Sequence, residues 1–294
     1  MKYFFLSSSH LEDRIWFRDD EDFKAGMNYV VLAATHCGVS VIVFVLMSNH
    51  VHFVLYGKNE SEMRAFYAYF KMLYAKYYRK KHGMVHFLRG NTLDCRQIFP
   101  SDEALERVIA YVLMNPVAAN ICLHPINYPW GCGNCFFSTR KIKGRAASTL
   151  GLRERRRILH SEQLPGKNEI VGEDGYILPE SYVRKDMVEA IFRTPARLNY
   201  FLNTSSKARQ VLESENSVMP SFRDQSLVVL AQDIVFSLYR KSRLSDLNKS
   251  EKQRLVYELR RRSGADPKQL ARVLEIPLDE VSALLSDYWN SPCT

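Results

Sequence analysis

The chain has 294 residues, of which 46% are hydrophobic and 25% are charged. This composition is typical of globular proteins that bury a large core, and it excludes a mainly disordered chain. No window holds about 18 consecutive apolar residues, the minimum for a membrane-spanning helix. The apolar stretch near the N-terminus is too short for a signal peptide. We therefore expect a cytoplasmic protein that makes no contact with membranes.

The excess of positive charge is concentrated in one stretch of the chain. The net charge is +9, and residues 140–157 alone contain eight basic residues and one acidic residue. A basic balance favours a polyanionic partner such as nucleic acid, although charge alone does not establish one.

The six cysteines are dispersed along the chain, which is typical of reduced thiols in a cytoplasmic protein. Cys132 and Cys135 form a CxxC pair, but a zinc site of this kind needs a second pair at matching spacing. The sequence contains no such second pair. We therefore interpret the CxxC spacing as incidental.

The first elements alternate between strand and helix. Residues 2–8 predict a strand, and residues 20–37 predict a helix with acidic residues in its first turn. Residues 39–57 are apolar and β-branched, with a polar break at Ser48 and Asn49. They predict one long strand, or two strands that meet at a turn.

Helices dominate the rest of the chain. Residues 60–82 predict an amphipathic helix rich in tyrosine and basic residues, and residues 101–115 predict a helix that stops at Pro116. Glycine, asparagine and basic residues in 131–175 indicate a linker. Residues 226–288 predict a helical region. The order of elements predicts a compact α+β fold, with an antiparallel sheet that has helices on one face, followed by an all-α C-terminal domain.

His50 and His52 are separated by a single valine within a predicted strand. Alternate side chains of a strand project from the same face, so the two imidazoles lie about 7 Å apart at the Cα level. Two imidazoles at this spacing can bind one metal ion. The alternative is two polar residues on a half-exposed strand.

Tyr111 and Asn115 lie four residues apart on a predicted helix. Residues at this spacing share one face of a helix. The alternative to a functional role is a helical tyrosine whose hydroxyl reaches solvent, with an asparagine near the end of the helix before Pro116.

Together these features resemble the single-tyrosine HUH transposases, and among them the REP-associated tyrosine transposases. VLMSNHVHFVL resembles the HUH motif, AYVLMNPVAANI the helix that carries the tyrosine, and YPW at 128–130 a segment that follows it. The basic and aromatic helix MLYAKYYRKKHG also has a counterpart in the family. The resemblance covers residues 1–140.

The resemblance implies a ferredoxin-like HUH nuclease fold and a role for four residues. His50 and His52 match the paired metal ligands, Asn115 the third ligand, and Tyr111 the nucleophile. The implied cofactor is Mg²⁺ or Mn²⁺, and imidazole ligands favour Mn²⁺. Ser48 stands where many relatives have proline, a change that we expect to affect only the shape of the turn.

Residues 267–285, PKQLARVLEIPLDEVSALL, resemble a helix-turn-helix in which Glu275 replaces the usual turn glycine. Residues 226–288 also resemble, loosely, the double-strand-binding domain of the bacterial replication initiator. The alternative is a plain helical bundle. The acidic residues Asp279 and Glu280 would be unfavourable near phosphates.

We therefore expect three regions: a catalytic domain over 1–140, a basic linker and mixed helical segment over 141–225, and a DNA-binding domain over 226–294. The expected function is a metal-dependent transposase that cleaves and rejoins single-stranded or hairpin DNA through a 5′-phosphotyrosine. Double-stranded DNA is the expected partner of the C-terminal domain, and the choice between monomer and homodimer stays open. The alternatives are a non-catalytic DNA-binding repressor and a replication or conjugation initiator.

Overall fold

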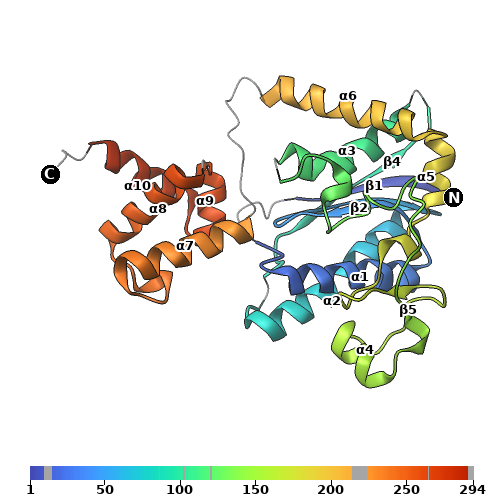
Figure 1. Cartoon of the computed structure of the whole chain (residues 1–294), viewed down its shortest axis with the longest axis horizontal. Helices are drawn as coiled ribbons and strands as arrows, with labels where there is room; N and C mark the ends of the chain where they lie inside the picture. Colours follow the sequence, from blue (N-terminus) through green and yellow to red (C-terminus); the bar gives the residue numbers. More distant parts are fainter. Residues whose placement is uncertain are drawn as a thin grey trace.

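A computed structural model of the chain describes residues 1–9, 15–85, 87–101, 103–119, 121–213, 224–263 and 265–290. Its first elements are β1 (Lys2–Ser9), α1 (Asp20–Cys37), β2 (Ser40–Leu46), β3 (Val51–Gly57), α2 (Glu60–His82) and β4 (Thr92–Ile98). The four strands form an antiparallel sheet in the order β2-β3-β1-β4 (Figure 1). The expected α+β class with an antiparallel sheet is confirmed.

The two faces of this sheet are covered by different helices, so the prediction that helices cover one face is wrong. The Phe53 ring of β3 packs against Phe66 and Phe70 of α2, with ring centroids 5.2 Å and 5.6 Å away. Because side chains alternate along a strand, His52 on the same strand faces the opposite side. That side is covered by α3 (Ala104–Ala118), which packs across β2 and β3 (Figure 1).

Local capping explains why the first two helices agree with prediction. Each begins after a residue whose side chain accepts a hydrogen bond from the first turn, Asp19 for α1 and Asn59 for α2. Each ends at a glycine in the left-handed region, Gly38 with φ 65° and Gly83 with φ 72°. Residues 39–57 form two strands rather than one, with the polar break in the turn between them.

The boundaries of α3 differ from the prediction of a helix over 101–115. The helix begins at Ala104, three residues later than predicted. Glu103, just before it, has φ 61°, which is not a right-handed helical conformation, and its side chain makes no capping hydrogen bond. The helix also continues past Pro116 to Ala118. Proline removes one backbone donor, but the ladder resumes where Ala119 N donates to Asn115 O at 3.0 Å.

The segment predicted as a linker over 131–175 contains ordered elements. They are β5 (Arg145–Ala146), α4 (Leu152–Ile158), β6 (Ile170–Val171) and the 3-10 turn Ala147–Thr149. The buried Asn28 of α1 holds this segment, since its Nδ2 donates to Ile158 O at 3.0 Å and its Oδ1 accepts from Ile177 N at 2.8 Å. The segment is rich in glycine and charged residues, but it forms an ordered layer that packs on α1.

The core of the sheet domain continues past residue 140, where the sequence predicts the catalytic domain to end. It includes buried side chains of α5 (Lys185–Phe192) and α6 (Pro195–Glu213), among them Val188, Phe192 and Phe201. Helix α6 packs along α3, so α3 lies between α6 and the sheet (Figure 1). Two further 3-10 turns, Pro125–Asn127 and Pro179–Ser181, connect these layers.

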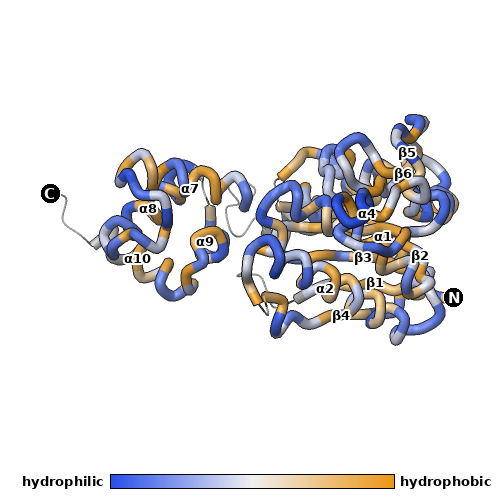
Figure 2. Tube along the Cα trace, turned by 90° about the horizontal axis from the view of Figure 1, so that it is seen from below, coloured by the Kyte–Doolittle hydropathy of each residue, from blue (hydrophilic) through white to orange (hydrophobic). Residues whose placement is uncertain are grey.

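The C-terminal elements α7 (Asp224–Tyr239), α8 (Lys249–Ser263), α9 (Pro267–Leu274) and α10 (Leu278–Asn290) form a helical bundle, with a 3-10 turn at Leu244–Asp246. Its hydrophobic core is a cluster distinct from that of the sheet domain, and this cluster also includes Ile15 from the N-terminal region. Figure 2 shows the bundle beside the sheet domain. The prediction of a helical C-terminal region is confirmed. No helix among the described residues is long and apolar enough to cross a bilayer.

We expect Asn28→Ala to lower the free energy of unfolding by about 1–3 kcal/mol, because it leaves a buried carbonyl and a buried amide without their partner. Trypsin should also cut the basic stretch over 140–157 faster once this segment loosens from α1. Urea denaturation and timed proteolysis measure the two effects. Asn168→Ala, at an exposed position of the same segment, is the matched control. Equal proteolysis of Asn28→Ala and wild type would show that other contacts hold the segment.

Candidate active site

His50 and His52 lie at the start of β3 with their rings next to each other. The ring centroids are 4.8 Å apart and the planes are inclined at 78°. His52 is 4% exposed, and Val51 between the two histidines is fully buried. The turn before them is closed by a hydrogen bond of 2.8 Å from Met47 N to His50 O. The alternation of β3 therefore brings together the two imidazoles that the sequence singles out.

The side chain of Asn49 determines which nitrogen of His50 carries its proton. His50 Nδ1 lies 2.8 Å from Asn49 Oδ1. An amide oxygen can only accept, so Nδ1 must donate and Nε2 keeps the lone pair. Nε2 is therefore the nitrogen that can bind a metal, and Asn49 orients the ring. Sequence reasoning assigned no role to Asn49, whose only signal is its place beside the motif.

Tyr111 reaches the histidines from α3 on the same face of the sheet. Its ring centroid lies 5.6 Å from that of His52 and 5.9 Å from that of Phe5. Phe5 in turn stacks on His52 at 5.8 Å, so the three rings pack as one group. The Tyr111 side chain is 40% exposed, which leaves it open to a substrate. Sequence reasoning missed Phe5, although the alternation of the first strand could have placed it on this face.

Asn115 is buried one helical turn beyond Tyr111. Its Nδ2 donates to Tyr111 O at 2.9 Å and to Val112 O at 3.4 Å. Pro116 has no N–H to give to Val112 O, the carbonyl four residues before it, so the asparagine amide supplies a substitute donor. These contacts fix Asn115 to its own helix. They engage its nitrogen, which leaves the amide oxygen as the end that can bind a metal.

The donor set fits a divalent metal ion with mixed nitrogen and oxygen ligands. Among the described residues, no group of three or more His, Cys, Asp or Glu side chains could hold a metal ion. The side chains that the sequence offers as metal ligands are therefore His50, His52 and the amide oxygen of Asn115. Two imidazoles with one amide oxygen suit Mn²⁺ better than Mg²⁺.

A cation on β4 lies beside the tyrosine. Arg96 pairs in register with Phe5, so its side chain shares the face that carries Tyr111. The hydrogen bond to Asp94 raises the pKa of Arg96, and Tyr111 raises it further to a smaller degree. Sequence reasoning missed Arg96, because it predicted no strand over 92–98.

The tyrosines of α2 are poor competitors for the role of nucleophile. Burial raises the pKa of Tyr78 to about 12, and burial raises the pKa values of Tyr67, Tyr74 and Tyr77 as well. A raised pKa leaves less phenolate at neutral pH. Helix α2 also covers the sheet face opposite His52.

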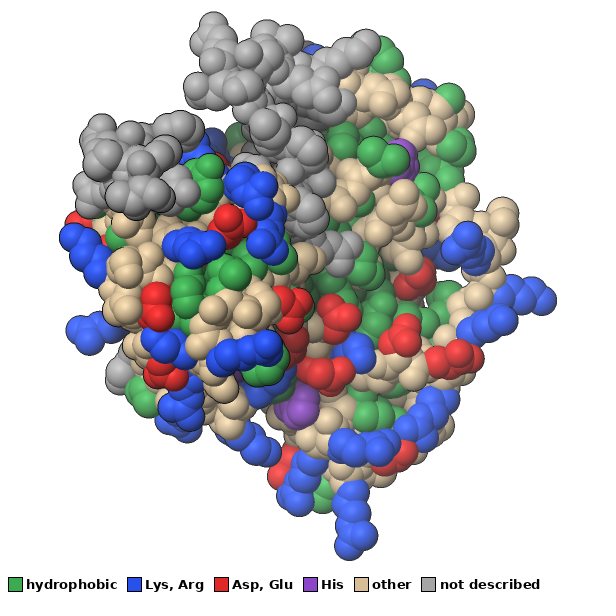
Figure 3. Space-filling model, turned by 60° about the vertical axis from the view of Figure 1, so that its left-hand side comes forward, with side chains coloured by type: hydrophobic (Ala, Val, Ile, Leu, Met, Phe, Trp, Pro, Cys, Tyr) green, Lys and Arg blue, Asp and Glu red, His purple; other side chains and the backbone are tan. Residues whose placement is uncertain are grey.

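A basic surface extends over the C-terminal half of α2 and over α4. The residues that follow α4 contact α2: Tyr69 Oη donates to Gln163 Oε1 at 2.7 Å, and the Tyr77 and His160 rings lie 4.9 Å apart. Its exposed cations, none of which forms an ion pair within the described ranges, are Lys76, Arg79, Lys80, Arg153 and Arg157. Figure 3 shows Lys and Arg side chains gathered along the lower part of the molecule, where α2 and α4 lie in Figure 1.

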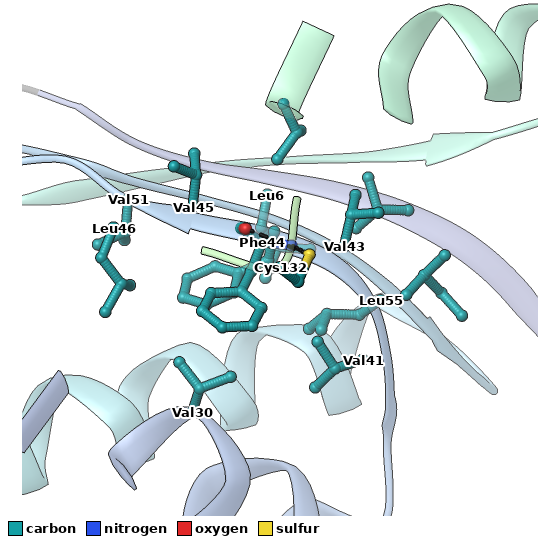
Figure 4. Packing of buried hydrophobic residues seen from close by; sticks show 14 of the residues in the cluster. Leu6, Val30, Val41, Val43, Phe44, Val45, Leu46, Val51, Leu55 and Cys132 are labelled. Carbon is teal, nitrogen blue, oxygen red and sulfur yellow. Dashed lines mark hydrogen bonds between the residues drawn. The ribbon is translucent and has the colours of Figure 1, made fainter. Parts of the chain in front are cut away.

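Cys132 and Cys135 belong to the core. Cys132 Sγ accepts a hydrogen bond of 3.1 Å from Phe44 N and lies among the apolar side chains of β2 (Figure 4). Burial raises the pKa of the Cys132 thiol to about 12, so the thiol stays protonated at neutral pH. The segment after YPW, for which the sequence offers no explanation, packs here along the edge of β2.

The expectation that Ser48 affects only the shape of the turn is wrong. Its hydroxyl donates to Asp224 Oδ2 at 2.6 Å, across the boundary between the sheet domain and the helical bundle. Its carbonyl accepts from Trp16 N at 2.7 Å. A proline at this position could not form the contact with Asp224, because it has no side-chain donor.

Comparison with known proteins adds no relative of the chain. No protein-family model matches it, and neither does any curated protein or solved structure. The roles considered for His50, His52 and Tyr111 therefore depend on the chemistry and positions of these residues.

We expect the stability effects of Asn115 and Pro116 to be coupled. Asn115→Ala should cost about 1–2 kcal/mol of unfolding free energy in the wild type, because the carbonyl of Val112 loses its donor. Asn115→Ala should cost less in a Pro116→Ala background, because the backbone N–H of residue 116 can then donate to the Val112 carbonyl. A double-mutant cycle by urea denaturation measures the coupling. Additive effects would contradict the substitute-donor role.

Proposed function

We propose that the chain is a metal-dependent, single-tyrosine DNA nuclease and strand transferase that acts on single-stranded or hairpin DNA. The observation that carries the proposal is the contact of the His50, His52 and Tyr111 rings on one face of the sheet. The chain order βαββαβ and the strand order β4-β1-β3-β2 support a ferredoxin-like arrangement, as the HUH resemblance implies.

The chemistry assigned to this chain is attack of Tyr111 Oη on the phosphorus of a phosphodiester. A bond forms between Oη and phosphorus, and the bond from phosphorus to the 3′ oxygen breaks. The phenolic proton passes to solvent, and the departing 3′ oxygen gains a proton. The products are a 5′-phosphotyrosine and a free 3′-hydroxyl. Attack of a 3′-hydroxyl on the phosphotyrosine reverses these steps and rejoins DNA without ATP.

The neighbouring residues would serve this step in different ways. A divalent ion held by His50 Nε2, His52 and the Asn115 oxygen would offset the negative charge that develops on the phosphate. Asn49 would keep the His50 ring oriented. Arg96, on the same face, would attract the phosphate. Phe5 would hold the tyrosine and His52 rings at their observed spacing.

The helical bundle is proposed to bind double-stranded DNA. Helices α9 and α10 are joined by a short turn in which Glu275 adopts φ 57°, the conformation that a glycine usually takes in a helix-turn-helix. Ala271, Val281 and Leu284 are buried between the helices of the bundle, as the resemblance requires. These contacts support a helix-turn-helix role for residues 267–285.

Incubation with Mn²⁺ and a labelled pool of single-stranded hairpin oligonucleotides should give a protein–DNA adduct that survives denaturant. The adduct should disappear in Tyr111→Phe and in the presence of chelator, because the first lacks the attacking oxygen and the second removes the metal. Denaturing gel electrophoresis measures it. Tyr69→Phe, on the other side of the sheet, is the matched control and should form the adduct as the wild type does.

The same assay separates the alternatives. Adduct that persists in Tyr111→Phe would move the nucleophile to another tyrosine. DNA binding without adduct across many sequences would favour the repressor. Cleavage of one duplex origin in preference to hairpins would favour the initiator nuclease.

The basic surface of α2 and α4 should contribute to DNA affinity by neutralising phosphates. Replacing Lys80 and Arg157 by alanine should weaken binding and reduce the slope of log affinity against log salt by about one for each phosphate that is no longer neutralised. Fluorescence anisotropy over a salt series measures both. The control removes the same charge at Lys2 and Lys58 and should leave the slope near the wild-type value. Equal slopes in the two double variants would contradict a role for this surface.

A further inference from the structure

A buried carboxylate joins the helical bundle to the sheet domain. Asp224, the first residue of α7, is 2% exposed. It accepts hydrogen bonds from Ser48 Oγ at 2.6 Å, Gln269 Nε2 at 2.9 Å and Arg272 Nε at 2.7 Å. Burial acts to raise its pKa, but Arg272 and these hydrogen bonds hold the pKa below its ordinary value. The carboxylate is therefore charged at neutral pH.

One of these hydrogen bonds leaves the bundle. Gln269 and Arg272 both belong to α9, which packs against α7 within the bundle. Ser48 belongs to the turn between β2 and β3, two residues before His50. Gln269 and Arg272 already supply hydrogen bonds to the buried carboxylate from within its own domain. The additional hydrogen bond from Ser48 connects the carboxylate to the sheet domain.

The turn that Asp224 contacts is short and closed on itself. Ser48 O accepts from Trp16 N at 2.7 Å and from Phe17 N at 3.1 Å, and Met47 N donates to His50 O at 2.8 Å. Only two peptide units separate Ser48 from His50, so a shift of Ser48 is passed on to the His50 ring. Ser48 thus links the contact with Asp224 to the turn that carries His50.

A second polar contact between the domains avoids this turn. Arg18 pairs with Glu275, the residue between α9 and α10, and its Nε donates to Tyr78 Oη at 2.6 Å. Neither partner of Arg18 belongs to residues 47–50. Loss of the pair between Arg18 and Glu275 therefore weakens docking of the bundle without releasing the turn, which provides a matched control.

We propose that Asp224 is a positioning residue: through Ser48 it fixes the β2–β3 turn that presents His50 to the candidate metal site. For the metal, this inference rests on the proposed function. A charge-assisted hydrogen bond from a buried carboxylate is among the stronger restraints available to a turn. Docking of the C-terminal bundle is thereby coupled to the affinity of His50 and His52 for a divalent ion.

The test compares three variants of the full chain: Ser48→Ala, Asp224→Asn and Glu275→Gln. Each variant is titrated with Mn²⁺ and no DNA. Electron paramagnetic resonance measures the free Mn²⁺, which gives the affinity for the metal alone. Hydrogen–deuterium exchange of residues 46–52 reports on the turn without any metal. Ser48→Ala removes one hydroxyl and keeps the carboxylate with Gln269 and Arg272, so it should fold if Asp224→Asn does not.

We expect Ser48→Ala to bind Mn²⁺ about fivefold more weakly, which corresponds to the loss of one hydrogen bond, and to exchange faster over 46–52. Asp224→Asn should change both in the same direction, and Glu275→Gln should match the wild type in both. Wild-type exchange over 46–52 in Ser48→Ala and Asp224→Asn would overturn the proposal, as would equal effects in Glu275→Gln. A wild-type chain that binds no Mn²⁺ would overturn the proposed function, and exchange over 46–52 would still decide the role of Asp224.

Discussion

The alternation of side chains along β3 is the constraint on which the rest of the structure depends. Val51, Phe53 and Leu55 are all fully buried, and Phe53 faces α2. The residues between them face α3, and His52 is one of these. A register shift of one residue would put His52 into the α2 interface and move Phe53 to the face of Tyr111. Burial of one face therefore fixes which side of the sheet holds the imidazoles.

A site on this face is assembled from elements that are each stabilised by local interactions. The tyrosine depends on α3, and α3 tolerates Pro116 because the Asn115 amide replaces the missing backbone donor. The same asparagine is the candidate third ligand, so one side chain would serve the helix through its nitrogen and the metal through its oxygen. An aspartate would keep an oxygen but lose the donors. Under the proposed ligand role, an amide would therefore suit residue 115 better than a carboxylate would.

Sequence reasoning succeeds here where the determinants are local. Helices α1 and α2 are predicted to within a residue because Asp19, Gly38, Asn59 and Gly83 cap them within their own turns. It fails where the determinant lies elsewhere in the chain. The stretch over 131–175 has the composition of a linker, yet it packs on α1 through distant residues: Asn28 forms hydrogen bonds with Ile158 and Ile177, and Val31 packs with Ala147, Leu150 and Val171.

The candidate site divides in the same way. The resemblance to the HUH family singles out His50, His52 and Tyr111, whereas Phe5 and Arg96 join them through strand register, which motif spacing does not reveal. Ser48 and Glu275 are two positions at which the sequence departs from the patterns it resembles, and both contact the other domain. A sequence pattern taken from one domain cannot predict these two residues, because their hydrogen-bond or ion-pair partners belong to the other domain. Asp224 shows the physical basis: a carboxylate buried between domains must find donors, and one of those donors is the hydroxyl that a proline at position 48 would lack.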